Sequence, residues 1–287
     1  MTMNGSTDMT APVRGAIMPG WNITLSLMLE DGRSKKIEKF TTINLSSEYR
    51  PTRLGATASR IETDINERTT TMTETTQARE MFQSAYENRY TWDKNFPGFT
   101  ADMQLVQGSE TYTGSVRINP DLTVELSGIE DEAVYKSVQA QLKDVVTHRQ
   151  SASFANVHGK NKFALGETDD SGAVEVHVSG AAMGSEYKVR DRVICYVQRV
   201  VGPMTFFIDT YETLDTGAGY VPTRYDLVMH NTKSGDLVQE VKFEDSYEAI
   251  GDYHIMTAQT THTKKEGNTT TTSWSYSNVN LLEPSLV

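Results

Sequence analysis

The chain has 287 residues, which is long enough for a large domain with a substantial hydrophobic core. With 37 % hydrophobic and 23 % charged residues, the composition excludes an intrinsically disordered chain and an integral membrane protein. The formal net charge of -11 argues against a general nucleic-acid binder and against docking on anionic lipid surfaces. A single cysteine, Cys195, excludes an intramolecular disulfide framework and a cysteine-based zinc site.

The acidic excess is not spread evenly along the chain. Residues 1–75 contain 9 basic and 9 acidic residues, so the whole net charge lies in residues 76–287. A polar, Thr-rich run without periodicity follows Arg68 and is typical of a linker. We therefore predict an N-terminal module with its linker over residues 1–71 and a second domain over residues 72–287. The first twenty residues carry no signal-peptide pattern, and no apolar run is long enough for a transmembrane helix.

The N-terminal module contains a predicted β-hairpin. Polar and apolar residues alternate over Trp21–Leu29 and again over Lys36–Leu45, and an Asp31-Gly32 turn lies between the two runs. Because two strands alone are only marginally stable, we expect this hairpin to pack on the main domain or on a partner.

The second domain begins with a predicted helix over residues 75–90, whose apolar residues recur at three-and-four spacing. Three strands of period two follow, near residues 99–105, 111–118 and 122–126. A second amphipathic helix is predicted over residues 130–149, where acidic residues at the start suit the helix dipole.

Strand patterns then continue to the end of the chain, separated by turns rich in Asp, Gly, Ser and Pro. The predicted strands lie near residues 162–168, 173–179, 186–190, 193–201, 204–213, 220–229, 237–247, 252–264 and 269–282. The predicted fold is mainly β: a large curved antiparallel sheet or half-barrel of about eleven strands, with two helices on its concave face. The strand pattern is compatible with a closed barrel and with an open half-barrel.

Few residues point to catalysis. The six histidines (His148, His158, His177, His230, His254 and His262) show no metal-ligand spacing, so neither a metal nor a cofactor is predicted. Cys195 lies in an apolar strand and is expected to be an inert buried thiol. The acidic pair Glu244-Asp245 is explained most simply as a solvent-exposed strand edge. No phosphate loop or nucleophile elbow is present, which disfavours an enzyme.

Aromatic residues are the more informative signal. Several of them crowd the junction between the first helix and the first strand, and the strand Met204–Tyr211 is apolar on both faces and should be covered on both. The helices, the N-terminal hairpin, a bound apolar molecule or another subunit would each supply this cover, and a plain core is the simplest explanation. The predicted ligand-binding residues are Trp92, Phe96, Phe99, Tyr187 and Phe206, with Arg224 at a polar head group. Most of the other arginines are expected to form surface salt bridges.

From about Ala78 onward the chain resembles the DUF3386 family, a domain of unknown function in cyanobacteria and plant plastids. The resemblance rests on the segments Ala85–Phe99, Arg117–Leu122, His158–Asn161, Ala182–Asp191 and Phe243–Tyr247. It implies an oxygenic phototroph and a cytoplasmic setting, where association with the cytoplasmic side of the thylakoid is open, and it carries no catalytic residue. The order of elements is also similar to that of LolA-like lipoprotein carriers, which hold acyl chains between a curved sheet and helices.

Two functions follow as hypotheses. The first is a non-enzymatic protein that holds an apolar ligand, a lipid or a pigment, between sheet and helices. The alternative is an assembly or interaction factor for a photosynthetic complex, which docks through the hairpin in residues 1–71, for example by adding a strand to its partner.

Overall fold

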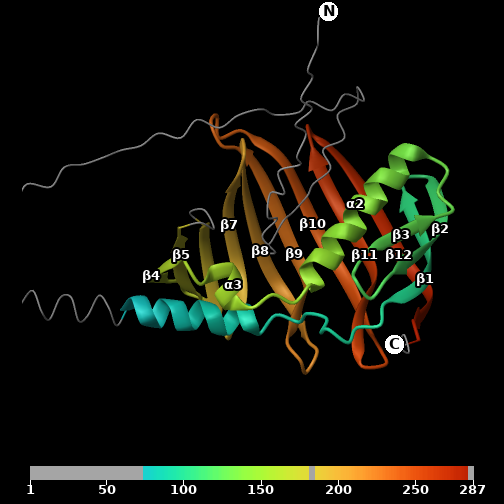
Figure 1. Ribbon diagram of the computed structural model, residues 1–287. Coiled ribbons are helices and arrows are strands. Elements are labelled where there is room, and N and C mark those ends of the chain that lie inside the picture. Colours follow the sequence, from blue (N-terminus) through green and yellow to red (C-terminus); the bar gives the residue numbers. More distant parts are fainter. Residues whose placement is uncertain (1–73, 181–184, 284–287) are drawn as a thin grey trace, which may run out of the picture.

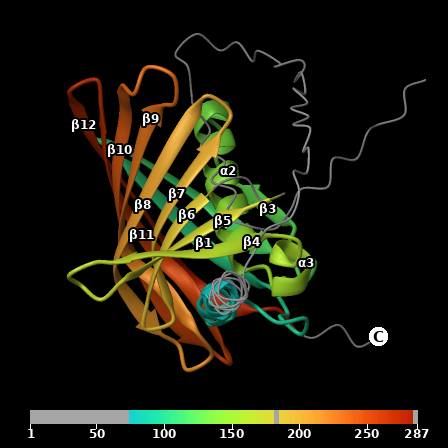
Figure 2. The ribbon, with the colours of Figure 1, turned by 90° about the vertical axis from the view of Figure 1, so that its left-hand side faces the viewer.

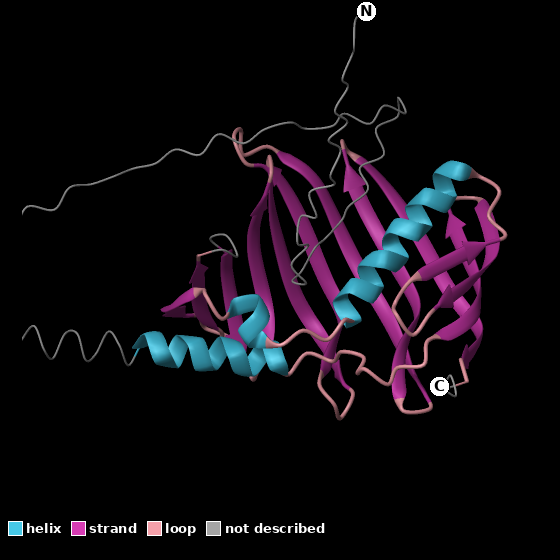
Figure 3. Cartoon of the chain, in the orientation of Figure 1, coloured by secondary structure: helices cyan, strands magenta, loops and turns pink. Residues whose placement is uncertain are grey.

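The computed structural model describes residues 74–180 and 185–283 (Figure 1). Within these residues the chain forms a 12-stranded antiparallel sheet and three helices (Figure 3). The hairpin expected at Trp21–Leu45 and the linker lie outside the described residues, so the division at residue 71 stays a prediction.

The sheet joins two meanders. From β4 to β12 each strand pairs with its neighbours in sequence, and β12 then pairs with β1, which continues into β2 and β3. Because β3 and β4 form the two edges, the sheet is open, and the prediction of a large curved antiparallel sheet is confirmed with twelve strands in place of about eleven. The strands are β1 Phe99–Gln107, β2 Glu110–Ile118, β3 Val124–Ser127, β4 Lys162–Thr168, β5 Val174–Ser179, β6 Ser185–Arg190, β7 Val193–Val201, β8 Met204–Asp215, β9 Tyr220–Asn231, β10 Leu237–Ile250, β11 Tyr253–Lys265 and β12 Asn268–Leu281.

Alternation along each strand decides which face is buried. In β1, Ala101, Met103 and Leu105 are buried whereas Asp102 and Gln104 between them are exposed. Successive side chains of a strand point to opposite faces, so this pattern requires one covered face and one solvated face. The sequence therefore specifies a sheet that helices cover on one side only.

The helices lie on the concave face of the curved sheet (Figure 2). The helix over residues 74–87 and the short α3, Phe154–His158, lie at the β4–β7 end, and α2, Glu132–Arg149, runs diagonally from the β2–β3 end toward the middle of the sheet (Figure 1). Both predicted helices are confirmed within a few residues at their ends. α3 was not predicted, because five residues are too few to show a helical period.

The first turn of α2 is capped by Asp131, whose carboxylate accepts hydrogen bonds from the backbone N–H groups of Ala133 and Val134, both at 2.9 Å. We expect Asp131→Ala to lower the free energy of unfolding by about 1 kcal/mol, because two helix N–H groups lose their acceptor. Urea unfolding measures the change. Asp131→Asn keeps an acceptor oxygen and should stay close to the parent protein; an equal loss in both variants would contradict a capping role.

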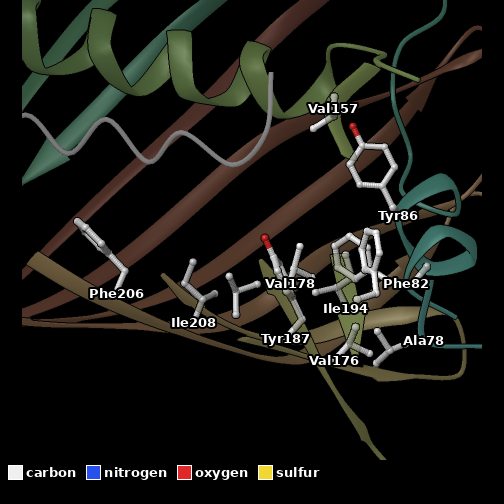
Figure 4. Close-up of a cluster of buried hydrophobic side chains, with 14 of the residues drawn as sticks. Ala78, Phe82, Tyr86, Val157, Val176, Val178, Tyr187, Ile194, Phe206 and Ile208 are labelled. Carbon is white, nitrogen blue, oxygen red and sulfur yellow. The ribbon is translucent and has the colours of Figure 1, made fainter. Parts of the chain in front are cut away.

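Two hydrophobic cores lie side by side under the helices. The first joins the helix over residues 74–87 and α3 to strands β4–β10, and Figure 4 shows Phe82 of that helix beside Ile194 of the sheet and Tyr86 beside Val157 of α3. The second core packs α2, through Val138 and its neighbours in the stripe, onto β1–β3, β11 and β12.

On strand β8 the described residues cover one face in full and the other in part. Phe206 and Ile208 belong to the first core, but Tyr211 on the opposite face is 50 % exposed. Phe207 on that face is half-buried and makes an edge contact with the ring of His230. The described residues leave this second face partly exposed, so the predicted further cover stays a prediction.

Candidate ligand-binding cavity

A cavity of about 270 Å³ lies between α2 and the concave face of strands β8–β11. It occupies the seam between the two hydrophobic cores, where the C-terminal half of α2 crosses the sheet (Figure 3). Its lining consists of Arg89, Ser137, Ala140, Gln141, Asp144, Val145, His148, Arg149, Ile208, Thr210, Tyr220, Pro222, Tyr225, Leu227, Gln239, Val241, Phe243, Asp245, Tyr247, Met256, Gln259, Thr261 and Thr263.

The sheet supplies an apolar floor through strand register. Ile208 pairs with Leu227, and Leu227 pairs with Val241, so three aliphatic side chains form one row across β8, β9 and β10. In the next row the rings of Tyr225 and Phe243 are stacked, with centroids 4.5 Å apart and an angle of 8° between their planes. Such a floor favours apolar ligand atoms over water.

A buried polar network connects α2 to the sheet at one wall of the cavity. The Gln141 side-chain amide donates to Gln259 Oε1 at 2.8 Å, and Gln259 Nε2 donates to Asp245 Oδ1 at 2.8 Å. The indole N–H of Trp274 also donates to Gln259 Oε1, at 3.3 Å. A smaller cavity of about 190 Å³ lies on the other side of this network and shares Ser137, Gln141, Gln259 and Thr261 with the first.

Asp245 is a buried carboxyl group within that network. Only 9 % of the residue is exposed, and burial raises its pKa to about 7. The hydrogen bond from Gln259, the charge of Arg149 and a hydrogen bond with Tyr225 act in the opposite direction and keep the pKa from rising further. Near neutral pH the group therefore exchanges between its acid and its carboxylate form.

The inner end of the cavity carries two arginines. Arg149, the last residue of α2, is only 8 % exposed, and its Nη atoms donate to the Tyr90 carbonyl at 2.8 Å and to the Tyr247 hydroxyl at 3.3 Å. Arg89 lies over the ring of Tyr86, at 3.8 Å from its centroid. His148 faces the same space, and burial, together with Arg149 and Arg89, lowers its pKa to about 3, so its imidazole is neutral.

None of the six side chains predicted to bind a ligand lines this cavity. Trp92 and Phe96 stack on each other in the second core, with centroids 4.0 Å apart, and Phe99 packs at their edge. Tyr187 and Phe206 belong to the first core, and Arg224 is exposed and pairs with Glu212 at 2.7 Å. The structure thus divides the six among two cores and the surface, and their ligand role stays a prediction.

Two residues of the cavity were given other roles from the sequence. The interpretation of Asp245 as part of a solvent edge is wrong, because it is in phase with Val241 and Phe243 on the covered face of β10. Arg149 follows Leu142 by seven residues and so lies on the buried stripe of α2 rather than in a surface salt bridge. A charged residue that is in phase with an apolar pattern is the sequence signal for a buried charged side chain, and it applies to Asp245 and to Arg149.

Other candidate groups carry little chemistry. Cys195 is half-buried, and burial raises the pKa of its thiol, which disfavours the reactive thiolate. In residues 74–180 and 185–283, no three His, Cys, Asp or Glu side chains gather as a metal site. No helix of that part of the chain has the length and hydrophobicity needed to cross a bilayer.

The fold and cavity define an open half-barrel with helices over an apolar hollow. Residues 73–282 match the family described as a protein of unknown function, DUF3386, and the chain belongs to that family, as its sequence motifs indicated. No curated protein matches the chain.

Solved structures that are similar to it include the following two. A domain named for outer membrane lipoprotein sorting, from Vibrio parahaemolyticus, is 13 % identical, with a TM-score of 0.31 over 73 % of this chain and 94 % of that one. A DUF1329 family protein from Desulfovibrio piger ATCC 29098 is 8 % identical, with a TM-score of 0.23 over 75 % of this chain and 95 % of that one.

Proposed function

We propose that the protein binds a small apolar molecule in the cavity between α2 and strands β8–β11. The observation that carries this proposal is an apolar floor of Ile208, Leu227, Val241 and Phe243 that α2 crosses without filling the space above it. Protein interiors are close-packed, and a hollow of this size leaves its lining atoms without contacts. A ligand restores those contacts and removes apolar surface from water.

The dimensions of the cavity restrict the ligand. Its volume of about 270 Å³ lies just below the range for small-molecule sites, which runs from about 300 to 1,000 Å³. A single alkyl chain or a compact ring system fits this space, whereas a two-chain lipid or a long pigment needs more. We therefore favour a one-chain amphiphile among the lipids and pigments that the sequence suggested.

The alternative of an assembly factor for a photosynthetic complex depends on the hairpin in residues 1–71. That segment lies outside the described residues, so this function, the partner and the cytoplasmic setting stay predictions.

The test uses the full-length chain after organic extraction of any bound material. We expect the neutral dye N-phenylnaphthylamine to bind saturably with a rise in fluorescence, and native mass spectrometry of gently purified protein to reveal a co-purified small molecule. Ala140 lies on α2 in the lining, and Ala140→Phe should fill the hollow and weaken dye binding by about tenfold or more, a change of about 1.4 kcal/mol.

Ala133→Phe is the matched control, because Ala133 lies on the same helix but is exposed and outside the lining. It should bind the dye like the parent protein. Circular dichroism establishes that both variants are folded. Equal binding by the parent protein and Ala140→Phe would place the dye elsewhere, and no saturable binding at all would end the proposal.

A further inference from the structure

The charges at the inner end of the cavity indicate which head group the ligand carries. We infer that the ligand is a single-chain amphiphile with a carboxylate head, which binds beside Arg149 and Arg89 while its alkyl chain lies on the apolar floor. This inference rests on the proposed function and adds the chemical class and the orientation of the ligand.

Arg149 is a buried cation with an incomplete set of hydrogen-bond partners. It is 8 % exposed, its Nε has no hydrogen-bond partner, its Nη atoms donate to a carbonyl and a hydroxyl group, and its Cζ lies 5.7 Å from the centroid of the Tyr247 ring. Among the salt bridges of the described residues, none involves Arg149 or Arg89. Burial of a guanidinium without an anionic partner is unfavourable, and a buried donor without an acceptor adds to that cost.

The protein itself compensates the buried charge of Arg149 only in part. The C-terminal end of α2 favours a cation, but its dipole is a partial charge and accepts no hydrogen bond from Nε. Asp245 is a buried acid of the same cavity, and the charge of Arg149 lowers its pKa, yet its carboxyl group is held by Gln259 and Tyr225 and no salt bridge of the described residues joins it to Arg149. Neither group gives Nε an acceptor, and Arg149 is part of the lining of the cavity.

The lining of the cavity changes in polarity and burial along α2. On α2 the lining runs from exposed Ser137 to buried Arg149, so Arg149 lies at the inner end, and half-buried Arg89 acts with it on the pKa of His148. Asp144 is the other acid that lines the cavity, and it is half-buried. It lies one helical turn before His148, whose imidazole is neutral. A carboxylate matches the planar guanidinium fork, and this charge-assisted pairing is about twice as strong as a neutral hydrogen bond.

The test compares three ligands of equal chain length on the delipidated full-length protein at pH 7. Displacement of N-phenylnaphthylamine, confirmed by titration calorimetry, gives the affinity for decanoate, decanol and methyl decanoate. We expect decanoate to bind at least about tenfold more tightly than decanol, because only the acid offers an anionic acceptor to Arg149. Equal affinities of the three ligands would overturn the inference while they support the proposed function, whereas no binding of any ligand would overturn both.

Variants assign the preference to the arginines. Arg149→Met keeps the length of the side chain and should reduce the ratio of decanoate to decanol affinity to near unity while decanol still binds. Arg89→Met should reduce the same ratio in part, and it keeps the test decisive if Arg149→Met does not fold. Arg224→Met is the matched control, because Arg224 pairs with Glu212 outside the cavity, and it should leave the ratio unchanged. A ratio that survives both cavity variants contradicts the inference.

Discussion

Phe82→Ala is expected to lower the free energy of unfolding by about 3–5 kcal/mol, because it leaves a cavity in the first hydrophobic core. Phe82 is 1 % exposed, and its ring contacts Tyr187, Phe163 and His158, with centroids 4.7, 5.6 and 5.1 Å away. These contacts join the helix over residues 74–87 to α3 and the sheet. Urea unfolding followed by circular dichroism measures the loss.

The same helix provides the control for this prediction. Glu80 is exposed, so Glu80→Ala should change the free energy of unfolding by no more than about 0.5 kcal/mol. A loss below about 1 kcal/mol for Phe82→Ala would mean that the helix contributes little to the stability of the sheet. In that case the first core would be held together by the strands alone.

Period-two patterns made most of the sheet predictable. β7, Val193–Val201, begins and ends where the sequence placed it, and β10 differs from its prediction only in its length. Strand alternation is a local property, and Gly- and Asp-containing turns mark its ends. The pairing of β12 with β1 joins residues far apart in sequence, so periodicity could not indicate whether the sheet closes.

The cavity was less predictable because it depends on how α2 crosses the sheet. Its lining combines residues of α2 with four strands, and no sequence spacing connects Gln141 to Gln259. The aromatic residues Trp92 and Phe96 were predicted to contact a ligand, but in the structure their rings stack on each other. The charged residues in phase with apolar patterns, Asp245 and Arg149, were the better guide.

Asp245→Asn is expected to stabilise the protein at pH 8 and to have little effect near pH 4. Burial raises the pKa of Asp245 from 3.8 to about 7, so the folded protein retains a proton that the unfolded chain has released. Between these two values the folded state binds more protons, and its stability falls as the pH rises. Above pH 7 the full penalty is present, which for about three pKa units amounts to about 4 kcal/mol.

The difference between variant and parent isolates this effect from other titrations. Burial lowers the pKa of His148 to about 3 and that of His158 to about 4, which makes stability fall toward acid pH and opposes the slope from Asp245. Both proteins contain these histidines, so their contribution cancels in the difference. The asparagine oxygen still accepts from Gln259, whose Nε2 lies 2.8 Å from Oδ1 in the parent protein, so the link to α2 is kept.

Urea unfolding across this pH range should give a stabilisation by Asp245→Asn that grows from pH 4 to pH 7 and is then constant. The control Asp236→Asn, at an exposed position, should give the same free-energy difference at every pH. A flat difference for Asp245→Asn would mean that the carboxylate is ionised at no cost beside Arg149, and the buried charges of the cavity would then already neutralise each other without a ligand.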